Sequence, residues 1–295
     1  MNWVILINQT VEKARNLKEL SLFLAHMNNQ PESHVGYCGE SEASICEALE
    51  EDFLTENGDL NFYISRATTG EIIAAIGVDI DETSAEVWGP FNKSSSLPLQ
   101  LELWNALLIE YPEVREFQFF INQENTLQQS FMEEIKAKES DEHLVLEIRR
   151  ENFTAVLDRR SNPFVQSDFD EFEKLHNELF PNTYYDASTI VGRINRSNVL
   201  IILRGHSNEL QGYAYFEVDA ETAEASLEYI GISVASRNQG LGTLLLKEAL
   251  TEMFSHPRIE IIQLTVEDTN NQAHTVYRRA GFEQKHTLIS YRFYR

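Results

Sequence analysis

The sequence of 295 residues contains few cysteines, prolines and glycines: 2, 7 and 13, respectively. The two cysteines, Cys38 and Cys46, are too few for a disulfide framework, and the apolar run Trp3–Ile7 is too short for a signal peptide. Both observations predict a reduced, cytoplasmic protein. No apolar run approaches the roughly 20 residues of a membrane-spanning helix, so we expect no membrane segment.

Positively charged residues are also scarce. Lysine and arginine together number 24 against 47 aspartates and glutamates, which gives a formal net charge of −23. Such an excess repels the phosphates of nucleic acids and anionic membrane surfaces, so neither is an expected partner. The charge is compatible with a cationic amine substrate, but a role in solubility alone is the favoured interpretation. The sequence does not indicate the oligomeric state.

Candidate metal ligands are few and widely spaced. His26, His34, Cys38 and Cys46 lie in one segment, but no pair among them has the tight spacing of a zinc site. The sequence therefore predicts ordinary packing for these side chains and no bound metal.

The most informative part of the sequence is Leu227–Leu250. Its first part, Leu227–Val234, is apolar and rich in β-branched residues, which predicts a buried strand. Its last part, which begins at Gly242, has apolar residues at helical spacing and predicts an amphipathic helix. A strand that turns through glycines into a helix leaves unpaired backbone N–H groups at the positive end of the helix dipole. This arrangement favours an anion site, best suited to phosphate.

The connecting loop reads Arg-Asn-Gln-Gly-Leu-Gly. Gly240 and Gly242 permit a positive φ and let a ligand approach the backbone, and Arg237 adds a positive charge. The loop is not a P-loop, because no lysine precedes Thr243, and it is not a dinucleotide fingerprint, because Leu245 stands where a third glycine is needed. The remaining alternative is a glycine-rich turn that binds no ligand.

A second motif follows downstream. Asn270, Ala273 and Tyr277 share one face of a predicted helix, and Gly281-Phe282 follows its end. The pair of patterns, R-x-x-G-x-G and then N-x-x-A-x-x-x-Y with G-F, resembles the two signatures of the GNAT superfamily of N-acetyltransferases. The resemblance covers roughly residues 162–295.

The resemblance implies that acetyl-CoA is the co-substrate and that a small amine is the acceptor. It implies backbone contacts to the pantetheine arm in the strand before the loop, where the family often has proline at the position of Val234. It implies a diphosphate site on the loop and further contacts on the second helix. The expected cofactor-binding residues are Ile232, Ser233, Val234, Arg237, Asn238, Gln239, Gly240, Leu241, Gly242, Thr243, Asn270, Ala273 and Tyr277.

Acetyl transfer to an amine needs a base, because an alkyl ammonium ion with a pKa near ~10 must lose a proton before it attacks a thioester. Glu228 is the candidate base, because it is a charged residue in an apolar strand, two pleats before Ile232. The alternative is a solvent-facing or salt-bridged glutamate. Tyr277 is the candidate acid by family resemblance, and the alternative is an ordinary core tyrosine.

The two halves of the sequence follow the same predicted order of elements. Three matched pairs occur in the same order in both halves: Val78-Asp79 with Val218-Asp219, Glu86-Val87-Trp88-Gly89 with Glu228-Tyr229-Ile230-Gly231, and Asn125 with Asn270. They indicate an internal duplication, and coincidence between two α/β domains is the alternative. The first half lacks R-x-x-G-x-G after Gly89, so we expect it to bind acetyl-CoA poorly.

The fold class that follows is α/β (α+β), with two GNAT-like domains. Each domain is expected to have a mixed, mostly antiparallel central sheet flanked by helices. Residues 1–150 are predicted to be a degenerate copy without the cofactor loop, and residues 151–295 the acetyl-CoA-binding catalytic domain. Four expected elements matter below: a strand at Trp3–Asn8, a helix at Val11–Met27, a helix capped by Ser167, and a last strand at Phe282–Phe293.

In this superfamily the acceptor site is built by the first two helices and the last strands, here Glu171–Ile194 and His286–Phe293. An amine pocket in this region has five candidate side chains, which could equally belong to the core and surface: Tyr184, Tyr185, Asp186, Tyr291 and Phe293. The leading hypothesis is an N-acetyltransferase that uses direct attack in a ternary complex. The alternative is a non-catalytic module that binds acyl-CoA or docks a partner. A third possibility is that the first half is a structural partner that shapes the acceptor cleft.

Overall fold

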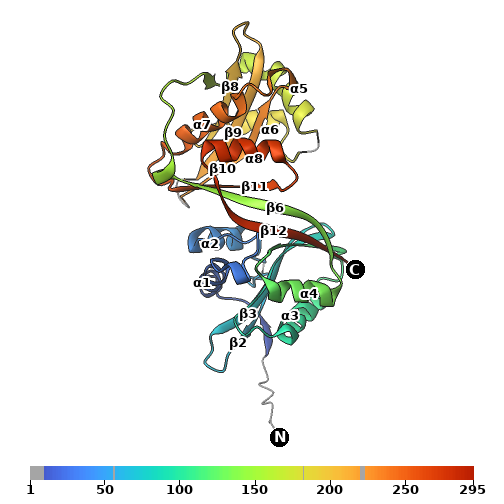
Figure 1. Cartoon of the computed structure of the whole chain (residues 1–295). Coiled ribbons are helices and arrows are strands. Elements are labelled where there is room, and N and C mark those ends of the chain that lie inside the picture. The colour runs from blue at the N-terminus through green and yellow to red at the C-terminus, as the bar shows by residue number, and fades with distance from the viewer. Residues whose placement is uncertain (1–9, 56, 182, 220–222) are drawn as a thin grey trace. The chain divides into compact units, whose positions relative to one another are not determined.

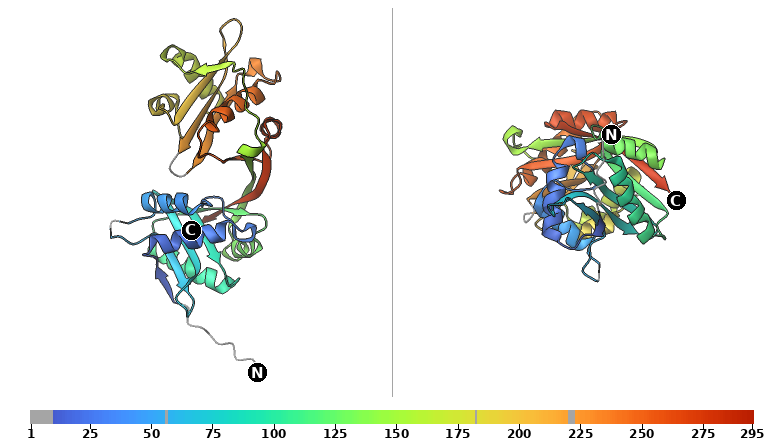
Figure 2. Two further views of the ribbon diagram at one scale, coloured as in Figure 1. Left: turned by 90° about the vertical axis from the view of Figure 1, so that its left-hand side faces the viewer. Right: turned by 90° about the horizontal axis from the view of Figure 1, so that it is seen from below.

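The computed structural model describes residues 10–55, 57–181, 183–219 and 223–295 (Figure 1). The strand expected at Trp3–Asn8 lies outside the described residues. The chain forms two compact units: unit 1 contains Met1–His143 and His286–Arg295, and unit 2 contains Leu144–Lys285. Two long strands, β6 (Lys138–Arg149) and β12 (Glu283–Tyr294), each carry the chain from one unit to the other (Figures 1 and 2).

Unit 1 is built on a sheet with the strand order β1-β2-β3-β4-β5-β12. The first five strands are β1 (Val11–Lys13), β2 (Phe62–Arg66), β3 (Ile72–Asp81), β4 (Ser84–Asn92) and β5 (Glu116–Asn122). Neighbouring strands are antiparallel except β4 and β5, which are parallel. Figure 1 shows α1 (Leu17–Asn28) and α2 (Glu42–Glu51) on one side of this sheet, and α3 (Leu97–Glu110) and α4 (Thr126–Ile135) on the other.

Side-chain caps explain where the helices of unit 1 begin. Asn16, Ser41, Ser96 and Asn125 each accept a hydrogen bond from the backbone N–H three residues ahead, which satisfies one of the donors that a helix start leaves unpaired. The helix expected at Val11–Met27 is therefore wrong in its first part. The chain forms β1 there, and Asn16 starts α1 only at Leu17.

The last strand completes unit 1. Its residues Leu288–Tyr294 pair antiparallel with Asn122–Glu116 of β5. Tyr291 is buried in the core of unit 1, and the Phe293 ring packs edge-on against Trp104 at 5.4 Å between centroids. Both side chains were candidates for an acceptor pocket beside Tyr184. Strand pairing with β5 places both in the hydrophobic core of unit 1, so the core alternative holds for these two residues and the pocket assignment does not.

Unit 2 repeats the plan with the strand order β6-β11-β10-β9-β8-β7. Its other strands are β7 (Ser161–Pro163), β8 (Asn198–Arg204), β9 (Leu210–Asp219), β10 (Glu224–Ile232) and β11 (Ile261–Glu267). The helices are α5 (Phe169–Leu179), α6 (Ala187–Arg193), α7 (Leu241–Met253) and α8 (Asn271–Ala280). Strand β10 is antiparallel to β9 and parallel to β11, so each unit has a parallel strand pair near its centre.

Details of the caps support the duplication. Asn125 before α4 and Asn270 before α8 have nearly the same backbone angles, φ −82° and ψ 70° against φ −83° and ψ 69°. Both side chains accept from the N–H three residues ahead, and both helices end in a left-handed residue, Lys136 and Gly281. The Ser167 cap, in contrast, is wrong. Asp168 instead accepts from the Val165 N–H at 3.0 Å, and α5 starts at Phe169.

The mixed, mostly antiparallel sheets flanked by helices confirm the predicted fold class. Among the described residues, no helix combines the length and apolar character that crossing a membrane would require.

Candidate active site

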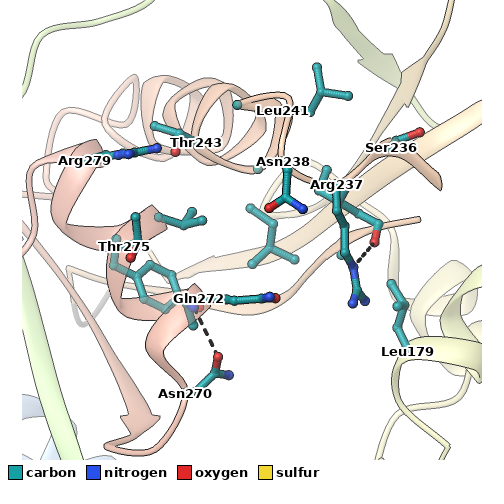
Figure 3. Close-up of a pocket in the computed structure, with 18 of the residues that line it drawn as sticks. Leu179, Ser236, Arg237, Asn238, Leu241, Thr243, Asn270, Gln272, Thr275 and Arg279 are labelled. Atoms are coloured by element: carbon teal, nitrogen blue, oxygen red, sulfur yellow. Dashed lines mark hydrogen bonds between the residues drawn. The ribbon is translucent and has the colours of Figure 1, made fainter. Parts of the chain in front are cut away.

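Unit 2 contains a cavity of about 700 Å³ beside β10, α7 and α8 (Figure 3). Most of the predicted site residues line it: Glu228, Ile232, Arg237, Asn238, Gly240, Leu241, Gly242, Thr243, Asn270, Ala273 and Tyr277. Three described residues of the prediction are not part of this lining: Ser233, Val234 and Gln239. The cavity thus brings together two sequence motifs that lie about thirty residues apart in the chain.

The loop between β10 and α7 turns sharply at two left-handed residues. Gly240 has a φ of 77°, as the sequence predicted, and Asn238 has a φ of 61°. Gly242 does not have a positive φ, so the expectation of backbone freedom there is wrong. Gly240 is the N-cap residue of α7 and has no side chain to cap it, and the first residues of the helix line the cavity. An uncapped helix start facing a cavity suits an anionic ligand.

The cations of the pocket come from both motifs. The Arg237 side chain donates through Nε to the carbonyl oxygen of Ile232 at 3.3 Å (Figure 3). Arg279 of α8 also lines the cavity, and in Figure 3 it lies with Thr243 at the end away from Arg237. Arg279 was not among the predicted site residues, although it is seven residues after Gln272, which also lines the cavity and so shares its helix face.

Asn270 and Tyr277, two residues of the second motif, line the cavity. Oδ1 of Asn270 accepts from the N–H of Ala273 at 3.1 Å (Figure 3), so this side chain starts α8 and its amide NH2 group is the part able to donate to a ligand. The Tyr277 ring packs against Phe282, 5.7 Å between centroids. Burial raises the pKa of the Tyr277 hydroxyl, which keeps it protonated as a hydrogen-bond donor near neutral pH.

Glu228 lies at an irregularity of β10. The register against β9 shifts between Leu227 and Tyr229, so Glu228 occupies a β-bulge. A bulge redirects a side chain and is common beside active sites, whereas the expectation from sequence assumed a regular pleat. Oε2 of Glu228 accepts from the Tyr184 hydroxyl at 2.7 Å, and Ser226 Oγ contacts Oε1. Burial raises the pKa of Glu228, and the hydrogen bond from Tyr184 partly opposes this rise.

Comparison with known proteins agrees with this geometry. A family model described as "Acetyltransferase (GNAT) family" matches residues 162–282. Residues 162–282 form a GNAT acetyltransferase domain. This match includes both motifs and the whole lining of the cavity.

Solved structures share the fold over nearly the whole chain. A GCN5-related N-acetyltransferase from Sphaerobacter thermophilus has a TM-score of 0.75 at 15% identity, covering 97% of this chain and 95% of its own. A tandem GNAT protein from the clavulanic acid biosynthesis pathway has a TM-score of 0.65 at 11% identity, with 97% and 98% coverage. A GNAT-family acetyltransferase from Colwellia psychrerythraea has a TM-score of 0.59 at 12% identity, with 96% and 99% coverage. The tandem arrangement is thus a known one for this fold.

A buried histidine supports the aromatic segment of the GNAT domain that contains Tyr184. His176 Nε2 lies 2.9 Å from the Tyr185 carbonyl oxygen, so Nε2 carries the proton and donates it, and Nδ1 accepts from the Tyr213 hydroxyl at 2.6 Å. Burial lowers the pKa of His176. The ring of Tyr185 packs against that of Tyr184, tilted by 38°, with 4.0 Å between centroids. His176 therefore fixes the segment that holds Tyr184 on Glu228, and no sequence motif identified it.

The corresponding region of unit 1 lacks the features of the GNAT site. Helix α3 is capped by Ser96, whose Oγ accepts from the Leu99 N–H, and Pro98 in its first turn has no N–H to offer. The carbonyl oxygen of Pro90 accepts from both Gln100 and Gln128, each at 3.1 Å. The start of α3 thus has a side-chain cap, which the start of α7 does not have. That unit 1 is a degenerate copy stays a prediction.

Proposed function

We propose that the GNAT domain transfers the acetyl group of acetyl-CoA to a primary amine by direct attack in a ternary complex. The observation that carries the proposal is one cavity lined by an uncapped helix start, by Glu228, whose pKa is raised by burial, and by the partly buried Tyr277. Acetyl-CoA, when bound, supplies a thioester carbonyl as the electrophile.

The loop and the two helices would hold the acyl donor. Main-chain N–H groups of Arg237–Thr243 and the dipole of α7 would bind the diphosphate, with Arg237 and Arg279 as nearby cations. The backbone of Ile232, Ser233 and Val234 would contact the pantetheine arm. Asn270 would donate its amide NH2, and the small side chain of Ala273 leaves space beside it.

Glu228 would act as the general base. It would accept a proton from the ammonium form of the acceptor and pass it to solvent, and the free amine would then form a C–N bond at the acetyl carbon. As the C–S bond breaks, the nitrogen would lose its second proton to Glu228, which leaves a neutral amide. A backbone N–H near Val234 would stabilise the oxyanion. Tyr277 would donate its proton to the departing thiolate, and solvent would restore that proton. The raised pKa of Glu228 suits a base that works near neutral pH.

The test measures the release of free coenzyme A thiol from acetyl-CoA in the presence of a panel of amines. The wild type is compared with the variants Glu228→Gln and Tyr277→Phe. We expect each variant to lower kcat by roughly 10²–10⁴-fold, and we expect Glu228→Gln to leave acetyl-CoA affinity within about threefold. Glu224→Gln, on the exposed part of the same strand, is the matched control and should retain wild-type turnover.

The competing function is a GNAT-like module that binds acyl-CoA or docks a partner without turnover. Tight acetyl-CoA binding with no thiol release on any amine would favour that module. Failure of coenzyme A to bind at all would contradict both the transferase and the acyl-CoA-binding module, and would leave partner docking as the remaining function. The net charge of −23 supports a role without nucleic acid or anionic membrane partners, and the cytoplasmic location remains a prediction from cysteine content.

A further inference from the structure

Outside the cavity of unit 2, three potential metal ligands meet in unit 1. His34 precedes α2, Glu40 lies a few residues later, and His286 belongs to β12 at the far end of the chain. Oε1 of Glu40 lies 3.6 Å from Nε2 of His34 and 3.4 Å from Nε2 of His286. Among the described residues, the ligand atoms of these three side chains all lie within 4.8 Å of one another. Sequence spacing alone could not reveal this cluster.

The segment that carries His34 and Glu40 is fixed by two asparagines of α1 and its C-terminal end. Asn28 is 1% exposed; its Nδ2 donates to the carbonyl oxygen of Cys38 at 2.6 Å, and its Oδ1 accepts from the Val35 N–H at 2.7 Å. Nδ2 of Asn29 donates to the Glu40 carbonyl oxygen at 2.7 Å. Both ends of the segment are therefore held before any ligand arrives, which lowers the entropic cost of binding one.

Strands β5 and β12 fix the third ligand. The backbone N–H of Asn122 donates to the His34 carbonyl oxygen at 3.1 Å, and the N–H of Gln123 donates to the Thr287 carbonyl oxygen at 2.9 Å. The rings of His34 and His286 stack with 4.0 Å between centroids and 29° between planes. The two imidazoles are thus aligned with Nε2 of each near the same carboxylate.

We propose that His34, Glu40 and His286 bind one divalent transition-metal ion of the zinc class. Two imidazole nitrogens and one carboxylate oxygen form a known ligand set for Zn²⁺, with the fourth position taken by water. Zinc–ligand bonds of about 2.0–2.2 Å at tetrahedral angles place the ligand atoms roughly 3.3 Å apart, close to the 3.4 and 3.6 Å found here. The histidine donors disfavour Ca²⁺ and Mg²⁺, which prefer oxygen.

In its present orientation, the amide of Asn122 opposes the protonation state of His286 that this site requires. Its Nδ2 lies 2.9 Å from Nδ1 of His286, and its Oδ1 accepts from the Glu124 N–H at 2.9 Å. A metal on Nε2 of His286 needs the ring proton on Nδ1, and that N–H needs an acceptor. The amide of Asn122 must turn to provide one. Aspartate at this position would accept from both the Glu124 N–H and the imidazole, so Asn122 is a positioning residue for affinity.

The experiment uses the full chain after treatment with a chelator, titrated with Zn²⁺ by calorimetry and followed by thermal unfolding. We expect one equivalent to bind and to raise the Tm. Glu40→Gln and His286→Gln should weaken binding by at least tenfold, and Asn122→Asp should tighten it by roughly 10–100-fold. His26→Gln, on α1 outside the cluster, is the control and should bind as the wild type does.

Visible absorption of bound Co²⁺ provides a second readout that does not depend on variant stability, because tetrahedral Co²⁺ absorbs far more strongly than hexa-aquo Co²⁺. Intense bands in the wild type that disappear in Glu40→Gln support the site. Wild-type protein that binds no Zn²⁺, or equal affinities for wild type and Glu40→Gln, would overturn it. Weaker binding by Asn122→Asp would contradict the assigned protonation and with it the proposed coordination.

Discussion

The hydroxyl of Tyr184 donates a 2.7 Å hydrogen bond to Oε2 of Glu228, and this contact joins the segment before α6 to the bulge in β10. Tyr184 is 72% exposed as a residue, so the pair lies at the solvent edge of the GNAT domain. The hydrogen bond stabilises the ionised carboxylate and lowers the pKa of Glu228, against the larger rise caused by burial. The two residues therefore set the basicity of the proposed base together.

Replacement of Tyr184 by phenylalanine should raise the pKa of Glu228 further. Only the ionised carboxylate can act as the base, and a higher pKa keeps Glu228 protonated up to a higher pH. The pH at which kcat/KM falls on the acidic side of its profile should therefore increase. The measurement is the pH profile of thiol release. Tyr294→Phe, at an exposed tyrosine of unit 1, is the control. A limb that stays in place would show that Glu228 is not the group that titrates in catalysis.

The two glycines of the loop should respond differently to alanine. Gly240 has a φ of 77° and open space where a Cβ would stand, so Gly240→Ala should cost about 1–2 kcal/mol through backbone strain. Gly242 has no such φ, and a Cβ there would lie 3.5 Å from Val276, an ordinary contact. Gly242→Ala should thus leave the Tm nearly unchanged and weaken coenzyme A binding, because the added methyl group enters the cavity lining.

Calorimetry with coenzyme A and thermal unfolding, run on both variants, would separate these effects. Equal losses of Tm in Gly240→Ala and Gly242→Ala would contradict the assignment of strain to Gly240 alone. Unchanged coenzyme A affinity in Gly242→Ala would argue that the ligand does not approach the start of α7.

His176 predicts a loss of stability in mild acid. Burial lowers its pKa in the folded state below the ordinary value near 6.5, so the unfolded chain binds a proton first as the pH falls. Its contribution is fully present above about pH 6.5 and declines as the pH falls toward the lowered folded-state pKa. His176→Gln should flatten this dependence in urea unfolding between about pH 8 and pH 5. His256→Gln, at a histidine with an intermediate exposure in the same unit, should leave it intact.

Glu248 should stabilise the segment that leads into β7. This glutamate of α7 is 1% exposed and accepts from the Arg160 N–H at 2.9 Å and the Ser161 N–H at 2.8 Å. Glu248→Ala leaves both donors without this partner and should cost about 1–3 kcal/mol. Glu252→Ala, one turn later and more exposed, should cost less than about 1 kcal/mol. Similar unfolding midpoints for the two variants would contradict this difference.

Most of the correct predictions from sequence depended on residues that lie close together in the chain. Glycine beside a helix start placed the turn at Gly240, and helical spacing placed Asn270 and Tyr277 beside one cavity. Each of these depends on residues within one or two turns of each other, which is the range over which propensity and periodicity act.

Features that depend on pairing between distant segments were not predictable in this way. The bulge at Glu228 arises from the register between β10 and β9, and no residue pattern in β10 marks it. Asn238 adopts a left-handed φ without being glycine. The pairing of β12 with β5 placed Tyr291 in the core of unit 1, because the last strand had more than one sheet that its alternating pattern could fit.

The position of β12 has a consequence for biosynthesis. Most of unit 1 is synthesised before unit 2, yet its sheet also needs His286–Arg295, which are synthesised after unit 2. Until those residues leave the ribosome, the edge of β5 has no neighbour from β12 and Trp104 lacks the ring of Phe293. Unit 2 consists of Leu144–Lys285, so all of its residues are synthesised before His286–Arg295. The nascent chain is therefore expected to mature in the reverse of its order of synthesis, a departure from the usual N-terminal-first sequence.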